Sequence, residues 1–207
     1  MRKFTFYQSN RFWPEIILLL EAVVLKWNSL SPQLLADEWK FYGNYCKCLE
    51  TENSSHLYGL LMRQNLSVLS LEERDIPTPK TDDKHDNEFF QKMQQVVFGH
   101  AFERALPQIE AKWGSAKQQR GNWPGLLDFC FHIRNGVFHG NQFNITGSIY
   151  QDTLWSGARI RKKYNGEHVM GLNIGFLGLA DVIALLYDLE GAIHNESVKP
   201  FNRAKIE

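Results

Sequence analysis

The sequence predicts a mainly α-helical domain: a helical bundle with a small β-hairpin or strand insertion before its last helix. Two observations support this fold class. Through the first two-thirds of the chain, apolar residues recur every three or four positions, as on one face of an amphipathic helix. After Gly140 the sequence changes to short, partly alternating segments that are punctuated by glycine, and a clear helical pattern then closes the chain.

The length and charge of the chain set limits on what it does. Its 207 residues fit a single domain, 1–207, that is large enough to bury a core. Lys and Arg together number 23, and so do Asp and Glu, which gives a net charge of zero. There is thus no global electrostatic argument for a nucleic-acid partner, and any basic surface must be local.

The cysteines and the apolar segments indicate a cytoplasmic protein. Three cysteines, two of them in Cys46-Lys47-Cys48, fit neither a disulfide framework nor a structural zinc site, so we expect reduced thiols. The first residues lack the apolar run of a signal peptide. The most apolar stretch, 16–25, is interrupted by Glu21 and is too short and too charged to span a bilayer.

Three helices are predicted in the first part of the chain. Pro14 suits the first turn of a helix over 14–27, where apolar residues follow at helical spacing. Ser31-Pro32 is a typical start for a second helix over 31–42. A third helical pattern runs over about 55–71.

A loop and two further helices are predicted in the middle of the chain. Segment 72–88 has two prolines, dense charge and one apolar residue, which predicts a flexible charged loop. The next helix is predicted over 87–113, with a break at Pro107 if the proline interrupts it. A second loop follows over 114–125, and Trp123-Pro124 opens another helix.

The last third of the sequence predicts a β-rich insertion at 141–175 and a final helix. Strands are expected over 143–150, 154–161 and 168–174, where glycines separate short apolar segments. The pattern over 176–195 returns to helical spacing.

The helix that follows Pro124 contains FHIRNGVFHG, residues 131–140, which mixes core side chains with chemically reactive ones. At about 100° per residue, one stripe of this helix is apolar, and its members are Leu126, Cys130, Ile133 and Val137. A second stripe is polar, and its members are Asp128, His132, Asn135 and His139. Arg134 falls on the apolar side, although an arginine is rarely buried without a partner. We therefore expect Arg134 to have a partner such as a buried acid.

Three interpretations of this helix compete. In the first, the polar stripe is a solvated face and Arg134 extends past its apolar neighbours or pairs with a carboxylate. In the second, Asp128, His132 and His139 hold a metal ion from one helix, although no second ligand cluster is obvious. In the third, the helix performs metal-free acid–base chemistry on a phosphate ester: arginine neutralises phosphoryl oxygens and histidine moves protons near neutral pH.

The run from Arg134 to His139, RNGVFH, resembles the R-x-x-x-x-H motif of the HEPN superfamily. The Asn135 that follows the arginine matches a polar residue that the ribonuclease members often carry. HEPN domains are α-helical bundles with this motif on one of the later helices. Many are metal-independent endoribonucleases of toxin–antitoxin, abortive-infection and CRISPR-associated systems. The matched segment is 125–140, and the insertion at 141–175 has no counterpart in the minimal bundle of the family.

The resemblance implies a homodimer in which two motif helices face one another and line a shared cleft for RNA. It implies that Arg134, Asn135 and His139 are catalytic, that no metal or other cofactor takes part, and that an antitoxin or regulatory protein controls the activity. His139 would accept the proton of the ribose 2′-OH, and Arg134 would stabilise charge on the phosphate. The alternative is a non-catalytic HEPN module that partners a nucleotidyltransferase or another protein.

Other polar residues are candidates for supporting roles. Asp128 and His132 share the polar stripe and are candidate accessory residues, although a plain surface histidine is the simpler interpretation of His132. The densest basic cluster lies in the hairpin-like region and comprises Arg159, Arg161, Lys162 and Lys163. It is either a solvated turn or an RNA-binding arm that follows the phosphates beside the cleft. Trp123 and Trp155 are candidates for base stacking, but tryptophans more often belong to the core.

Overall fold

The computed structural model describes residues 3–28, 68–72, 84–146, 149–150, 153–156, 158–171, 175–194 and 205–206. Over these residues the fold is mainly α, as predicted. The elements in chain order are β1 (Lys3–Tyr7), α1 (Trp13–Asn28), β2 (Val68–Glu72), α4 (Lys84–Trp113), α5 (Ala116–Gln119), η2 (Arg120–Asn122), α6 (Gly125–Phe138), β3 (Ile149–Tyr150), β4 (Leu154–Trp155), β5 (Ala158–Arg159), η3 (Lys162–Tyr164), α7 (Leu179–His194) and β6 (Lys205–Ile206).

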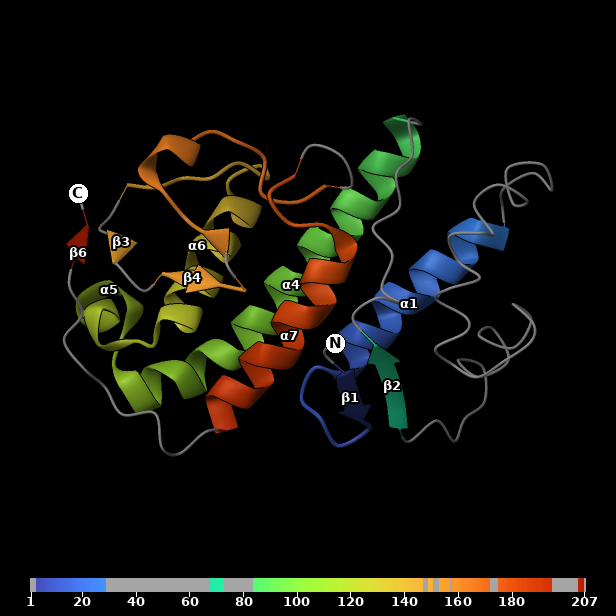
Figure 1. The fold of residues 1–207 in the computed structure, drawn as a ribbon, viewed down its shortest axis with the longest axis horizontal. Coiled ribbons are helices and arrows are strands. Elements are labelled where there is room, and N and C mark those ends of the chain that lie inside the picture. The colour runs from blue at the N-terminus through green and yellow to red at the C-terminus, as the bar shows by residue number, and fades with distance from the viewer. Residues whose placement is uncertain are drawn as a thin grey trace.

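Helix α4 is the centre of the bundle. It packs against α1, α6 and α7, and α6 also packs against α7. Figure 1 shows α4 and α7 side by side, with α1 toward one end of the molecule and α6 toward the other. The core between these four helices contains apolar side chains of each helix. Among these side chains are Ile16, Leu20, Phe98, Phe102, Phe129, Ile133, Leu185 and Leu189.

Two boundaries of α4 differ from the prediction. The helix begins at Lys84, so the charged loop predicted over 72–88 is wrong for its last five residues; residues 73–83 lie outside the described ones. Charged residues do not oppose a helix start, since acidic side chains are favoured near the positive N-terminal end of the helix dipole. The possible break at Pro107 does not occur, because the helix continues to Trp113. Pro107 lies on an exposed face, where water can bond the carbonyl that the proline leaves free.

Strands β1 and β2 form an antiparallel pair with the register Lys3↔Glu72 to Tyr7↔Val68. The third predicted helix, over 55–71, is therefore wrong at its end, where 68–71 is strand; the remainder of it and the helix predicted over 31–42 lie outside the described residues. The burial of β1 alternates as a strand requires: Phe6 is buried, whereas Tyr7 is exposed. The prediction failed here because the two strands pair across more than sixty residues of sequence.

The described residues of the predicted insertion, 141–175, contain only short strands, and the single strand predicted over 154–161 is wrong because these residues form a hairpin. Strands β4 and β5 form a hairpin with Leu154↔Arg159 and Trp155↔Ala158, and β3 pairs with β6. Elsewhere an aromatic cluster holds the insertion together, with Phe143 and Phe176 edge to face at 5.3 Å between ring centroids. The loop predicted over 114–125 contains the short helices α5 and η2.

The final helix is confirmed: it was predicted over 176–195 and is observed as α7, Leu179–His194. Its first turn is capped by Asp181, whose carboxylate accepts the Gly178 backbone N–H at 2.9 Å. Burial raises the pKa of Asp181, while the bond from Gly178 partly offsets that effect. Among the described helices, none combines the length and the apolar character that crossing a membrane requires.

Candidate functional site

Helix α6 is buried around almost its whole circumference except at its C-terminal end. Leu127, Phe129, Cys130 and Ile133 are fully buried between α4, α7 and the β4 segment. The helix ends at Phe138, and His139 caps it with its backbone N–H bonded to the carbonyls of Asn135 and Gly136 at 3.0 and 3.1 Å.

The R-x-x-x-x-H motif occupies this accessible end. Arg134 and Asn135 are half-buried, and Phe138 and His139 are exposed. Gly140 and Asn141 then turn the chain back with φ of 73° and 66°, in the left-handed region that suits glycine and asparagine. The structure thus brings the three predicted catalytic residues to the surface in the last turn and cap of one helix.

Arg134 is held on three sides by neighbouring groups. Its Nε donates to Glu103 Oε1 at 2.6 Å and its Nη2 also contacts that carboxylate, while Nη1 donates to Asn135 Oδ1 at 3.1 Å. The guanidinium lies 4.7 Å from the ring centroid of Phe138, in cation–π range. The expected acid is present, but it is not buried: the side chain of Glu103 is 41% exposed and that of Arg134 is 28% exposed.

Asp128 and His132 are not on a solvated face, so this part of the prediction is wrong. Both are buried. Thr153 Oγ1 donates a hydrogen bond of 2.5 Å to Asp128 Oδ2, and Arg120 Nε forms an ion pair of 2.8 Å with Asp128 Oδ1. His132 Nε2 lies 3.9 Å from Asp128 Oδ1. This half of the polar stripe is covered because Arg120 of η2 and Thr153 before β4 contact Asp128, and these contacts tie α6 to its neighbours.

The alternative metal site is not formed. Asp128 and His132 point into the protein, whereas His139 is exposed at the end of the helix. Within the described parts of the chain, no group of three or more His, Cys, Asp or Glu side chains could hold a metal ion. The neighbouring Cys130 thiol is also buried, and burial, followed by the charges of Asp188 and Asp128, raises its pKa.

The predicted basic cluster lies on the insertion, around η3. Arg159 is half-buried on β5, and Arg161, Lys162 and Lys163 are exposed. Backbone hydrogen bonds join the chain that follows η3 to the chain that follows His139: Gly166 N–H donates to the Phe143 carbonyl at 2.8 Å, and Val169 N–H donates to the Asn141 carbonyl at 2.9 Å.

The two candidate stacking residues belong to the core. Trp123 is fully buried and its Nε1 donates to the Gly114 carbonyl at 2.8 Å. Trp155 is also buried and donates to Asp188 Oδ2 at 2.7 Å. Neither ring has a face that is free to stack on a base.

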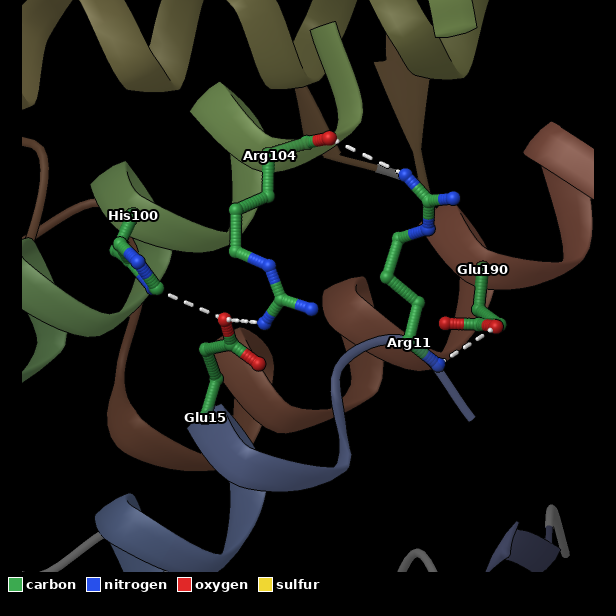
Figure 2. A network of polar contacts seen from close by, with 5 residues as sticks. All are labelled: Arg11, Glu15, His100, Arg104 and Glu190. Carbon is green, nitrogen blue, oxygen red and sulfur yellow. Dashed lines mark hydrogen bonds and ion pairs between the residues drawn. The ribbon is translucent and has the colours of Figure 1, made fainter. Parts of the chain in front are cut away.

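A second polar cluster, which the sequence did not reveal, joins α1, α4 and α7 (Figure 2). The carboxylate of Glu15 on α1 is 3% exposed, and its Oε1 accepts from His100 Nδ1 at 3.0 Å and from Arg104 Nη1 at 2.6 Å. Arg11 donates to the Arg104 carbonyl at 3.2 Å and, through its backbone N–H, to Glu190 Oε1 at 3.0 Å. The sequence does show an acidic residue, Glu15, at the start of an apolar helix. Its partners could not be predicted because they are distant in the sequence.

A cavity of about 310 Å³ lies between β1, the start of α1 and the end of α7. Its walls are mostly apolar, and its lining residues include Phe6, Phe12, Ile16, Leu186 and Tyr187. None of the three predicted catalytic residues lines it. The cavity is therefore separate from the motif at the end of α6.

Comparison with known proteins yields no match to the chain, whether to a protein-family model, to a curated protein or to a solved structure. The arguments for a function therefore rest on the motif residues and on their positions.

Proposed function

We propose that this chain is a metal-independent endoribonuclease of the HEPN type, with Arg134, Asn135 and His139 as its catalytic residues. The observation that carries the proposal is the location of these residues. A helix that is otherwise buried exposes its final turn, and that turn holds a fixed guanidinium and an exposed imidazole. Arginine binds phosphate oxygens and histidine transfers protons near neutral pH, and both functions suit cleavage of RNA without a metal ion.

The proposed reaction uses the ribose of the substrate as its nucleophile. The imidazole of His139 takes the proton of the 2′-OH, and the 2′-oxygen attacks the adjacent phosphorus. The guanidinium of Arg134 stabilises the charge that develops on the non-bridging oxygens. The bond from phosphorus to the 5′-oxygen breaks, which gives a 2′,3′-cyclic phosphate and a 5′-OH. DNA is spared because it lacks the 2′-OH.

The contacts of Arg134 are consistent with phosphate binding. Glu103 occupies the Nε edge of the guanidinium and fixes its plane, and Asn135 accepts from Nη1. A phosphate can bind the exposed part of the guanidinium, and Asn135 would hold the same phosphate or orient the imidazole of His139. Arg159, Arg161, Lys162 and Lys163 would then bind phosphates further along the RNA.

An apolar surface beside the motif supports the expected homodimer. Phe138 on α6 is 56% exposed and Val96 on α4 is 62% exposed. The two helices meet here, since a methyl group at Gly99 would lie 3.2 Å from Phe138 Cζ. Exposed apolar groups beside polar ones are typical of interaction surfaces. Pairing of two copies through this face would bring two motifs together, as the family resemblance implies.

The resemblance also suggests the biological setting. An unrestrained ribonuclease harms its host, so we propose a neutralising antitoxin or a regulatory protein as partner. The proposed setting is a toxin–antitoxin or phage-defence system, and the proposed location is the cytoplasm.

One observation favours the second candidate function, a non-catalytic binding or regulatory module. The negative charge of Glu103 on the guanidinium weakens the attraction of Arg134 for a phosphate. If that pair persists in the presence of RNA, the motif serves only to pack α6 against α4, and the chain acts through a protein partner such as a nucleotidyltransferase.

The two functions are separated by cleavage of labelled single-stranded RNA in EDTA. We expect the wild-type chain to cleave, and Arg134→Ala and His139→Ala each to lower the rate by about 10²–10⁴-fold. Lys117→Ala, a change of an exposed lysine on α5, is the matched control and should leave the rate unchanged. Failure of the wild type to cleave, or equal rates for wild type and both motif variants, would favour the non-catalytic module.

A further inference from the structure

The imidazole of His100 is anchored on one edge and open on the other. Its Nδ1 donates to Glu15 Oε1 at 3.0 Å, and Glu15 is 3% exposed, whereas the His100 side chain is 64% exposed (Figure 2). A carboxylate on Nδ1 fixes the tautomer and the orientation of a histidine, and leaves Nε2 to exchange protons. His100 thus has a buried positioning group and an accessible ring, which is the arrangement of an acid–base residue.

The charges around His100 suit a phosphate substrate. Arg104, one turn further along α4, donates to the same Glu15 oxygen at 2.6 Å and keeps 41% of its side chain exposed. The guanidinium of Arg104 balances the charge of Glu15, so an approaching phosphate meets no net negative charge at this pair. Glu103 is the other acidic group on this part of α4, and it is paired with Arg134.

His100 is the neighbour in sequence of Gly99, the residue of α4 that packs against α6. Gly99 on α4 lies under the ring of Phe138 on α6, at 3.2 Å for a methyl group built on the glycine. His100 follows Gly99, and His139 follows Phe138. Glu103, which binds Arg134, is three residues after His100 and hence on the adjacent turn of the same helix face.

We propose that His100 is the general acid of the RNA cleavage reaction and that Glu15 is its positioning residue; this inference rests on the proposed function. The motif supplies one histidine per chain, but the reaction needs a proton acceptor and a proton donor. As the 2′-oxygen forms its bond to phosphorus, His139 holds the 2′-OH proton. As the bond to the 5′-oxygen breaks, Nε2 of protonated His100 transfers its proton to that oxygen, and the neutral ring keeps its Nδ1 proton on Glu15.

The other possible donor is His139 of a second copy, and a purely structural role for His100 is a further possibility. His100→Asn separates these cases. The Asn Nδ2 replaces the Nδ1 donor to Glu15 and preserves the link between α1 and α4, but the side chain cannot act as an acid. His100→Ala removes both functions, and the thermal midpoints of the two variants report on the structural part.

The test compares two substrates in EDTA with the full-length chain. One is an oligoribonucleotide that the wild type cleaves, and the other carries sulfur in place of the 5′-oxygen at the cleaved bond. A thiolate leaves without protonation, so a general acid matters only for the oxygen substrate. We expect His100→Asn to lower the rate on the oxygen substrate by about 10²–10³-fold and on the sulfur substrate by less than tenfold. His139→Ala should be slow on both.

A pH profile provides the second measurement. An acid must be protonated, so the wild-type rate on the oxygen substrate should fall at high pH, and His100→Asn should lose that descending limb. The charged groups near the ring are Glu15, Arg104 and Glu103. A role of His100 in folding alone would leave the descending limb of the pH profile in place.

Three results would overturn the proposal. Equal rates for wild type and His100→Asn on the oxygen substrate would assign the acid to another group, such as His139 of a second copy. An equal loss on both substrates would show that His100 acts on structure or binding. No cleavage of either substrate by the wild type would contradict the ribonuclease function itself, and the inference with it.

Discussion

At the level of single residues, phosphate binding in the proposed site depends on the charges around Arg134. Its guanidinium is shared among a carboxylate, an amide oxygen and an aromatic ring, and all of these groups reach the surface. An exposed Arg–Glu pair stabilises a protein by only about 0–1 kcal/mol. Glu103 therefore matters less for folding than for the orientation and the charge of Arg134.

Glu103→Gln tests that balance. The amide keeps an acceptor for Nε but removes the negative charge, so we expect tighter RNA binding, with KM lowered about threefold to tenfold and little change in kcat. Glu88→Gln, at an exposed position on the same helix, is the matched control. A weaker affinity for RNA in Glu103→Gln than in the control would show that the carboxylate supports binding rather than opposing it.

The buried pair of Arg120 and Asp128 makes a different prediction. Asp128→Asn removes the charge that balances Arg120, whose side chain is 15% exposed. Loss of one partner from a buried ion pair costs about 3–5 kcal/mol, so the midpoint of urea unfolding should fall markedly. Thr153→Val removes one neutral donor from the same carboxylate and should cost about 1–3 kcal/mol. If Asp128→Asn cost less than Thr153→Val, Arg120 would have to be solvated in the folded protein.

At the scale of elements, the site depends on how the insertion packs on α6. Gly136 lies within the motif, and a methyl group built on it would lie 2.3 Å from Val169 Cγ2 and 3.1 Å from the Gln142 carbonyl oxygen. Backbone hydrogen bonds from Val169 and Met170 to Asn141 hold this segment in place. The glycine is thus required by close approach of the insertion, and not by its φ.

Gly136→Ala should destabilise the protein by about 1–3 kcal/mol, because neither the valine nor the backbone can move freely. Adding Val169→Ala should recover part of that loss, since it removes the closest atom. Gly191→Ala on α7, where nothing lies within 4 Å of the added methyl group, should instead stabilise the protein by about 0.5–1 kcal/mol. Urea unfolding measures all three, and a neutral Gly136→Ala would mean that the insertion is loosely docked.

Several helices are predicted well from the sequence. The helices over 14–27, 87–113 and 176–195 follow from apolar periodicity, which is a local property, and each is found close to its predicted ends. The pairing of β1 with β2 and the burial of Asp128 and His132 depend on segments distant in the chain. A helical wheel orders the side chains on α6 but does not say which of its faces other elements cover.

At the scale of the whole molecule, we propose that two copies associate through the α4–α6 crossing. Phe138 in the motif is exposed, and so is Val96, which lies one turn before Gly99, the residue of α4 that packs against Phe138. Helix α4 packs against both α1 and α6 (Figure 1). His100 lies on α4 and bonds to Glu15 on α1, and His139 follows α6, so α4 supports both proposed proton-transfer residues.

Val96→Asp should shift the protein from dimer to monomer in sedimentation experiments and lower its RNA cleavage at least tenfold, because a carboxylate in an apolar interface is left unpaired. Leu18→Asp, which alters an exposed apolar side chain on α1, should change neither property. A wild-type protein that is monomeric at all concentrations and still cleaves RNA would remove the dimer from the mechanism.

Cleavage of RNA by its own 2′-OH without a metal ion leaves characteristic product ends, and identifying those ends tests the proposed function. The full-length chain is incubated in EDTA with an oligoribonucleotide and with the same oligonucleotide lacking the 2′-OH at the cleaved position. We expect the oligoribonucleotide to give a 2′,3′-cyclic phosphate and a 5′-OH. The oligonucleotide that lacks the 2′-OH should not be cleaved at that position. Products that end in a 3′-OH and a 5′-phosphate, or cleavage at the deoxy position, would contradict it.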